Sequence, residues 1–384
     1  MAMRHSLGLL ALSTAFLACS GHYYEVGDMD GAAGASVNGG SGATGTDEPG
    51  NAVAGTHAVG ATGSGGTMSA GEGMPVGEFG PQCVPSGAPS QLAGQFAEPA
   101  VIWNRVAMLT WGAPVAPQFG LPDATTYAWA GDVARAALLN VQDTLGKVPG
   151  VETALRQWLA LPATESFQHP WSETVATSNP VLSELLLQPL AEQGRVGIFT
   201  EPSWLAAHSL ISTRGVEIER ALFNLSVPPP PPGLDDTPPD LELTDRQWLE
   251  AATAQPPCAA CHQLFDPTGF ALGHFDRDGK YRELDHGKPV DATGTRARGM
   301  PQIEREFDGI EEFGRQFAGS CEATLGFADQ FLLAAMTING VPDAQRDALF
   351  DASRARVERA FVNGGRTYEA MIKAYIQSPA GLRP

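Results

Sequence analysis

Positive charge is scarce in this chain. Its 384 residues contain 24 lysines and arginines against 43 aspartates and glutamates, which gives a formal net charge of −19 and a sequence pI near 4.7. Binding to nucleic acid depends on lysine and arginine side chains that displace counterions from phosphates. We therefore exclude nucleic acid as a partner.

Long apolar runs are also missing. A membrane-spanning helix needs about 20 apolar residues, and no segment after the start of the chain provides them. The opening MAMRHSLGLLALSTAFLACS has a basic residue at Arg4 and a shorter apolar run from Leu7 to Leu17. That length is typical of the core of a signal peptide, so we predict that residues 1–18 direct export and are removed.

The end of this opening predicts where the exported chain goes. Its tetrapeptide FLAC is similar to the bacterial lipobox, in which the cysteine after the cut is lipidated and becomes the first residue. Cys19 would then anchor the protein to a membrane. Ser20 favours an outer membrane, with the chain on its periplasmic or surface face. Ordinary signal-peptidase cleavage, which leaves Cys19 without a role, is the alternative.

Large apolar side chains are almost absent between residues 31 and 77, where glycine, alanine, serine and threonine dominate. A segment of this composition cannot bury enough surface to offset the chain entropy lost on folding. We predict a disordered tether over residues 19–82, which holds the folded part away from the membrane.

Alternation of apolar and polar residues, typical of strands, is scarce in the remainder, whereas helical spacing recurs. The segment DVARAALLNVQDTL at 132–145 places its apolar residues largely along one stripe, and FADQFLLAAMTI repeats the pattern. The run VPPPPPGLDDTPPD cannot be helical, because proline lacks a backbone donor. We predict a mainly α protein with a helical domain over 83–226, an extended linker over 227–240 and a helical module over 241–384.

Cysteine is rare, with five in the chain, yet Cys258 and Cys261 stand three apart, directly before His262. On a helical turn both thiols lie on one side. This spacing suits two thioether bonds to one haem c, with His262 as an axial iron ligand. A disulfide between the two thiols and a structural zinc site are alternatives, although no second ligand pair at zinc spacing follows. A thioredoxin-like pair would need a βαβ context that the sequence lacks.

The residues after this motif read DPTGFALGHFDRDGKYR. They resemble the C-x-x-C-H…D-P-x-G-F-A-L-E-x-F-D-x-x-G-x-x-R signature of the secreted planctomycete-type cytochrome c families, whose C-terminal modules are domains of unknown function. The resemblance extends from about Cys83 to the C-terminus. It implies that 241–384 is a c-type cytochrome-like module, that one haem is held covalently by Cys258 and Cys261, and that the protein is exported.

Other residues of the signature have implied roles at the cofactor. Phe270 and Phe275 would pack on the haem, Arg282 would bind a haem propionate, and Gly269 would let the backbone approach the ring. The alternative for each is a loop that supports only itself. Gly273 stands where the family prefers glutamate, which removes a carboxylate from the expected haem edge.

The sixth iron ligand is less clearly indicated. Met300 precedes a proline in RGMPQ, much as small electron-transfer cytochromes present an axial methionine on an extended loop. An ordinary loop residue explains it equally well, and His274 and His286 are rival ligands. With no sixth ligand, an open iron position would favour peroxide or oxygen chemistry.

Cys83 and Cys321 are the other two cysteines of the predicted folded part. Export leads to an oxidising compartment, where a disulfide between them would close the start of the folded part against the last helical module. Two separate thiols are the alternative that the sequence leaves open.

Motifs of the common hydrolases and nucleotide-binding enzymes are missing, since no H-E-x-x-H, nucleophile elbow or Walker motif is present. The sequence therefore predicts no particular enzyme. The leading function is electron transfer in the cell envelope with an unidentified redox partner. One alternative is a non-redox scaffold or binding lipoprotein with a structural C-x-x-C disulfide, and another is a peroxidase or oxidase with an open haem face.

Overall fold

The structure is a computed structural model. It describes the following parts of the chain: residues 83, 85–91, 96–114, 148–162, 164–227, 242–256, 258–296 and 305–384. Several predicted features lie outside these residues: the signal peptide at 1–18, Cys19, the tether at 19–82, the helix at 132–145, the linker beyond residue 227, and Met300. They remain predictions from the sequence.

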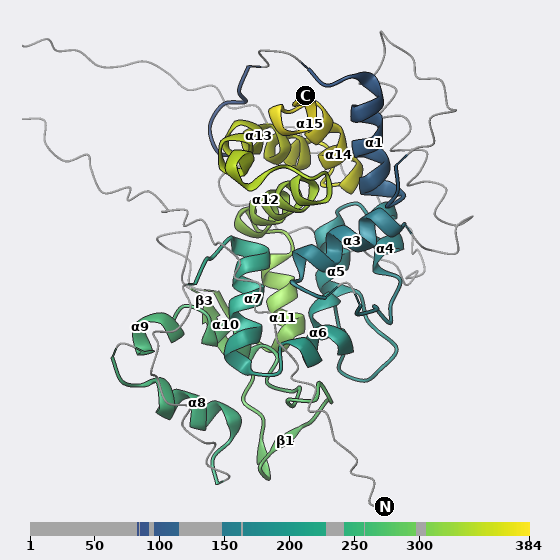
Figure 1. Cartoon of the computed structure of the whole chain (residues 1–384). Helices are drawn as coiled ribbons and strands as arrows, with labels where there is room; N and C mark the ends of the chain where they lie inside the picture. Colours follow the sequence, from purple (N-terminus) through teal and green to yellow (C-terminus); the bar gives the residue numbers. More distant parts are fainter. Residues whose placement is uncertain are drawn as a thin grey trace, which may run out of the picture. The chain divides into compact units, whose positions relative to one another are not determined.

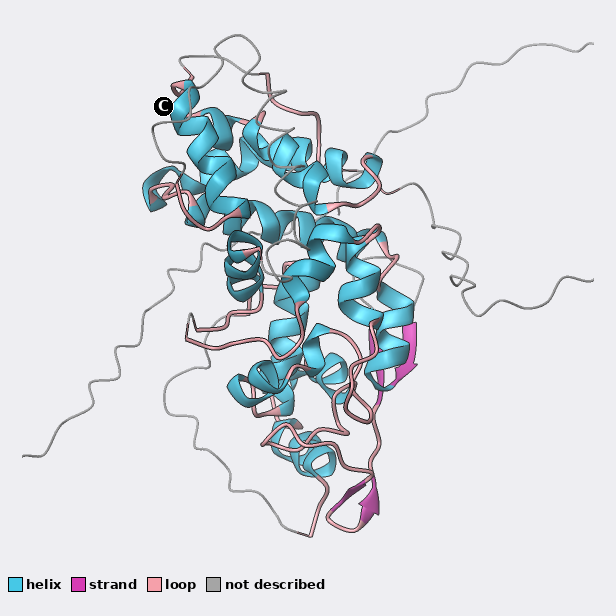
Figure 2. Cartoon of the chain, turned by 90° about the vertical axis from the view of Figure 1, so that its right-hand side faces the viewer, coloured by secondary structure: helices cyan, strands magenta, loops and turns pink. Residues whose placement is uncertain are grey.

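The described residues are mainly α-helical, as the sequence predicts. Figure 2 shows strands only as two short pairs among helices and loops. In chain order the elements are α1 (Pro99–Thr110), α3 (Pro149–Trp158), α4 (Trp171–Thr177), α5 (Val181–Leu187), the 3-10 helix η2 (Ile198–Thr200), α6 (Pro202–Ala207), α7 (Ile211–Phe223), α8 (Asp245–Thr253), α9 (Cys258–His262), α10 (Asp266–Phe270), β1 (Leu284–Asp285), β2 (Lys288–Pro289), β3 (Thr293–Arg296), β4 (Arg305–Asp308), α11 (Gly309–Phe317), α12 (Cys321–Ile338), α13 (Asp343–Asn363), α14 (Tyr368–Ile376) and α15 (Pro379–Leu382).

Local sequence explains where several helices begin. Proline occupies the first turn of α1, α3, α6, α10 and α15, a place where its missing N–H has no helical partner to lose. Thr244 caps α8 by accepting from the backbone of Gln247, whose side chain accepts in return from the backbone of Thr244. This reciprocal pair satisfies two backbone donors that the start of a helix leaves free.

One hydrophobic core includes residues from both sides of the predicted linker. Helix α7, from the N-terminal side, packs on α10 and α12 of the C-terminal side, and α12 also packs on α3 (Figure 1). The rings of Trp158 on α3 and Phe327 on α12 meet edge to face, with centroids 5.0 Å apart. The segments 83–226 and 241–384 therefore share a core, and the site on the C-terminal segment is built partly by the N-terminal one.

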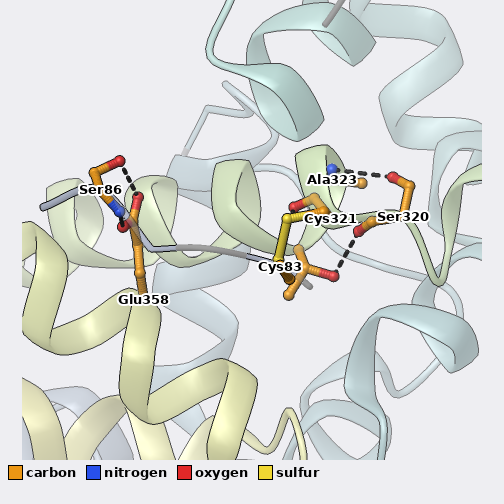
Figure 3. Close-up of a disulfide and its surroundings, with 7 residues drawn as sticks. Cys83, Ser86, Ser320, Cys321, Ala323 and Glu358 are labelled. Carbon is orange, nitrogen blue, oxygen red and sulfur yellow. Dashed lines mark hydrogen bonds between the residues drawn. A yellow bond between two sulfur atoms is a disulfide. The ribbon is translucent and has the colours of Figure 1, made fainter. Parts of the chain in front are cut away.

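A strap, defined here as Cys83 with residues 85–91, fastens the start of the described chain to α12 and α13. Cys83 is joined to Cys321 at the N-terminus of α12 by a disulfide, with their Cα atoms 5.0 Å apart (Figure 3). The backbone N–H of Ser86 donates to Glu358 of α13 at 2.5 Å, and its hydroxyl donates to the same carboxylate at 3.1 Å. The structure thus forms the pairing of Cys83 with Cys321 that the sequence left open.

Beneath the strap lies a buried cluster of two carboxylates and one arginine. Arg354 donates to Asp329 at 2.6 Å and to Glu358 at 3.0 Å, and both carboxylates are almost inaccessible to solvent. Burial raises the pKa of Asp329 to about 8; the guanidinium of Arg354 opposes the rise, and the neighbouring Glu358 adds to it. Two acids sharing one base therefore favour the retention of a proton in this cluster.

Within the residues that the structure describes, no helix has both the length and the apolar composition to cross a bilayer.

Candidate functional site

The C-x-x-C-H motif forms one short helix at the surface. Helix α9 runs from Cys258 to His262, and none of its residues is buried. Cys258 is half-buried, Cys261 is exposed, and both are free thiols. Residues three apart on a helix are neighbours on one face, so the two sulfur atoms are placed to bond a single planar group.

The structure contains no disulfide between Cys258 and Cys261, which was one alternative for this motif. The disulfide of the described residues joins Cys83 to Cys321, whereas Cys258 and Cys261 remain unbonded. A structural zinc site gains no support either. The one group in the described part of the chain that could hold a metal with three acidic, histidine or cysteine side chains is Asp245, Asp285 and His286, and it contains no residue of the motif.

His262 is held by one ring nitrogen. Its Nδ1 lies 2.9 Å from Oδ2 of Asp266, the first residue of α10 and four positions further along the chain. The hydroxyl of Ser212 on α7 lies 3.4 Å from the same nitrogen. When Nδ1–H donates to the carboxylate, the other nitrogen, Nε2, carries no proton and can bind a metal.

Asp266 is a buried carboxylate with an incomplete set of partners. Its residue is 5% exposed, and its second oxygen, Oδ1, is buried without a hydrogen-bond partner. Burial raises the pKa of Asp266, whereas hydrogen bonds from Ser212 and His262 oppose the rise. This buried carboxylate therefore makes its direct contact with the ring nitrogen of His262.

Two glycines bring the parts of the site together. A Cβ atom on Gly215 of α7 would lie 2.1 Å from the carbonyl oxygen of Phe265, and one on Gly269 of α10 would lie 2.2 Å from that of Ile211. Helices α7 and α10 therefore touch backbone to backbone, which places Ser212 against His262. Gly269 is required for this helix contact, and its expected role in letting the backbone approach a planar cofactor stays a prediction.

Ser212, His262 and Asp266 are the residue types of a serine hydrolase triad, but their geometry differs from one. In a triad the serine and the carboxylate bind opposite nitrogens of the imidazole, so that a proton can pass from the hydroxyl to the ring. Here both side chains contact Nδ1. The arrangement orients the imidazole and offers no base to the serine.

Phe270 and Phe275 are fully engaged in protein contacts. Both residues are buried. The guanidinium of Arg246 lies 4.2 Å from the ring centre of Phe270, and that of Arg195 lies 5.2 Å from the ring centre of Phe275. These contacts favour the alternative given above, in which both rings pack within their own loop. They give no evidence that either ring packs on a cofactor.

Arg282 braces two acidic side chains. Its guanidinium donates to Asp285 at 2.7 Å and to Asp245 at 2.8 Å, which links the β1–β2 hairpin to the start of α8. The propionate contact expected from the sequence has no support here, because the fork of Arg282 is already used. The same bridge places one positive charge between the two carboxylates of the Asp245, Asp285 and His286 group.

The rival sixth ligands are found in different surroundings. His274 has Nδ1 2.9 Å from the carbonyl oxygen of Arg282 and stacks on Tyr281. His286 is exposed in the turn between β1 and β2, at a positive φ of 49°. Met300, the predicted ligand, lies outside the described residues, so its assignment stays a prediction.

Sequence reasoning did not assign Asp266 and Ser212 their places in the site. Asp266 carries a weak signal, because it follows His262 by only four positions, although a turn separates the end of α9 from the start of α10. Ser212 carries none, since it stands 50 residues before His262 and meets it only through the crossing of α7 and α10. Arg214 was also missed; it is buried and donates to the carbonyl oxygens of Phe275 and Asp276 at 2.6 Å.

The described residues form a mainly helical protein in which the C-x-x-C-H motif lies on a short helix with no buried residue. Residues 195–285 match the family model described as PSCyt3, a protein of unknown function (DUF1588). This match contains Ser212, α9, Asp266 and Arg282. No curated protein matches the chain, and no solved structure matches it either.

Proposed function

We propose that this protein is an exported haem c protein that transfers electrons in the cell envelope. The observation that carries the proposal is helix α9, where two free thiols stand one turn apart and His262 is held through Nδ1, with no partner for Nε2 among the described residues. A structural disulfide between Cys258 and Cys261 would not require an orienting carboxylate on His262, whereas an iron ligand would use one.

The residues present fit one covalent haem. Cys258 and Cys261 would form the two thioether bonds, and Nε2 of His262 would be the axial ligand. Asp266 and Ser212 hold the imidazole in place. A bound haem c would supply one-electron chemistry at its exposed edge. Because α9 has no buried residue, a partner protein can approach the motif closely.

A spectrum of the mature protein tests this proposal. The chain is produced in a host with c-type maturation machinery, and its pyridine haemochrome spectrum and intact mass are measured. We expect a c-type α-band and the added mass of one haem, both lost in Cys258→Ala/Cys261→Ala. The matched control is Cys83→Ala/Cys321→Ala, which removes the same number of cysteines outside the motif and should keep both signals. A featureless parent, when a known cytochrome matures in the same host, would refute haem binding.

The location of the protein is part of the proposal and rests on its first twenty residues. Lipidation of Cys19 would anchor the chain to the outer membrane. Metabolic labelling with a fatty acid should mark the parent and Ser20→Ala, whereas Cys19→Ala should lose the label and leave the membrane fraction. A label that persists in Cys19→Ala would rule out this anchor.

A peroxidase or oxidase is the second candidate, and one observation favours it. The carboxylate of Asp266 on His262 makes the imidazole a stronger donor, and electron donation by an axial ligand favours cleavage of an O–O bond. A ferric spectrum that is high-spin and shifts with added cyanide would support this candidate. A low-spin spectrum that cyanide leaves unchanged would support electron transfer.

A further inference from the structure

We propose that Asp266 is the positioning residue of this site: through Oδ2 it holds His262 with the proton on Nδ1, and so presents an unprotonated, electron-rich Nε2 to the haem iron. The inference rests on the proposed function, because it assigns a role toward the same cofactor. It goes further in assigning control of the reduction potential to a particular side chain.

The geometry selects one tautomer of His262. A neutral imidazole has one nitrogen that donates and one that accepts. With Nδ1 2.9 Å from the Asp266 carboxylate, the favourable arrangement has Nδ1–H as donor to Oδ2. Nε2 then has no proton to lose before it binds a metal. A hydrogen-bond partner that allowed both tautomers of the imidazole would not keep Nε2 unprotonated.

The fold holds Asp266 in this position from several sides. Its helix, α10, packs on α7 through Gly215 and Gly269, and a Cβ atom on Gly294 of β3 would lie 2.2 Å from the carbonyl oxygen of Pro267. The next residue but one, Thr268, donates its hydroxyl to buried Glu219 at 2.6 Å. Asp266 therefore has little freedom to turn away from His262.

The two carboxylate oxygens of Asp266 differ in their hydrogen-bond partners. Oδ2 contacts His262, and Ser212 also hydrogen-bonds the carboxylate, whereas Oδ1 is buried with no hydrogen-bond partner among the described residues. A carboxylate that served only to stabilise the fold would be expected to have both oxygens satisfied, because buried polar atoms nearly always have hydrogen-bond partners. The oxygen of Asp266 that has a direct contact is the one that faces the ring nitrogen of His262.

The inference predicts the direction of a redox effect. A carboxylate hydrogen-bonded to a ligating imidazole raises the basicity of the ligand, which stabilises ferric over ferrous iron and lowers the midpoint potential. Asp266→Asn removes the charge at nearly constant shape. We expect its midpoint potential to rise above that of the parent, while the haem content stays the same.

The redox titration needs a control for charge and a second test without haem. Asp278→Asn removes one carboxylate from an exposed turn and should leave the midpoint potential close to that of the parent. In the Cys258→Ala/Cys261→Ala chain, labelled with ¹⁵N histidine, NMR should show His262 protonated on Nδ1. Adding Asp266→Asn should shift the population toward Nε2–H.

The outcomes separate this inference from the proposed function. Haem in the parent together with equal potentials in Asp266→Asn and Asp278→Asn would overturn the role of Asp266 and leave haem binding standing. A parent without haem would overturn the proposed function, and the NMR measurement would still decide whether Asp266 fixes the tautomer. If Asp266→Asn fails to fold, the NMR measurement on the Cys258→Ala/Cys261→Ala chain with Asp266 intact decides the question. Protonation of His262 on Nε2 in that chain would overturn the inference.

Discussion

Gly215 and Gly269 lie at the contact between α7 and α10, where neither position has room for a side chain. Each glycine faces a backbone carbonyl oxygen of the other segment, and no rotation of a flexible side chain can relieve a clash with backbone. The contact aligns Ser212 with His262, which belong to distant parts of the sequence. The contact of Ser212 with His262 thus depends on Gly215 of α7, a helix that lies outside the C-x-x-C-H motif.

Enlarging either glycine should destabilise the protein. We expect Gly215→Ala and Gly269→Ala each to lower the free energy of unfolding by about 1–3 kcal/mol, as overpacking of a close contact does. Urea denaturation followed by circular dichroism measures the change. Gly287→Asn is the control, because Gly287 has a positive φ of 77° with open space around it, and asparagine tolerates that conformation. Equal stability of Gly215→Ala and the parent would contradict the close packing.

Removal of Arg282 should weaken the fold and leave the proposed haem binding unchanged. Asp285 is buried, and Arg282→Ala would leave it and Asp245 without their shared cation. We expect a loss of about 3–5 kcal/mol, the range for breaking a buried pair, measured by urea denaturation. Arg315→Ala, which breaks an exposed pair with Glu311, should cost less than about 1 kcal/mol. Unchanged stability with loss of haem would instead restore the propionate role.

The disulfide and the C-x-x-C-H motif should respond independently to mutation. Cys83→Ala/Cys321→Ala should lower the free energy of unfolding by about 2–5 kcal/mol, the usual cost of removing a native disulfide, and leave the haem spectrum intact. Denaturation of the parent with and without reductant provides the same comparison in one chain. A reductant that leaves the stability of the parent unchanged would show that the bond between Cys83 and Cys321 contributes nothing.

The acidic cluster under the strap predicts a dependence of stability on pH. The pKa of Asp329 is raised from its model-peptide value of 3.8 to about 8. A raised pKa means that the folded state binds the proton more tightly, so the contribution is complete below about pH 3.8 and is lost as the pH rises through about 8. Asp329→Asn, which stays neutral, should be less sensitive to pH over this window.

Thermal melts from pH 5 to pH 9 compare Asp329→Asn with the parent. Asp343→Asn, which alters an exposed pair with Arg346, should follow the parent at every pH. Identical slopes for the parent and Asp329→Asn would show that this carboxyl retains no proton in the folded protein.

Much of the fold could be predicted from the sequence, because it depends on local patterns. Helical spacing predicts a mainly α protein, and the motif at Cys258 to His262 indicates a helical turn with two thiols on one face. The partners of Arg282 could not be predicted in this way. Its fork suits a propionate and a pair of carboxylates equally well, and only tertiary packing brings Asp245 and Asp285 within its reach.

Aromatic residues raise a related difficulty. A buried phenylalanine in a signature is compatible with a cofactor surface and with an ordinary core, since both exclude water. The structure distinguishes them at Phe275, which lies beneath Arg195 and beside Tyr281. Asp266 stands only four positions after His262, across the turn between α9 and α10, whereas Ser212 required the crossing of two helices that no local pattern encodes.

The bond between Cys83 and Cys321 spans 238 positions of the sequence and makes that stretch a closed covalent ring. Cys258 and Cys261 are members of the ring. A single proteolytic cut anywhere within it opens the ring without releasing a fragment, so a nicked protein would migrate as one species until it is reduced. Any group attached to Cys258 and Cys261 would therefore stay linked to both ends of the chain after such a cut.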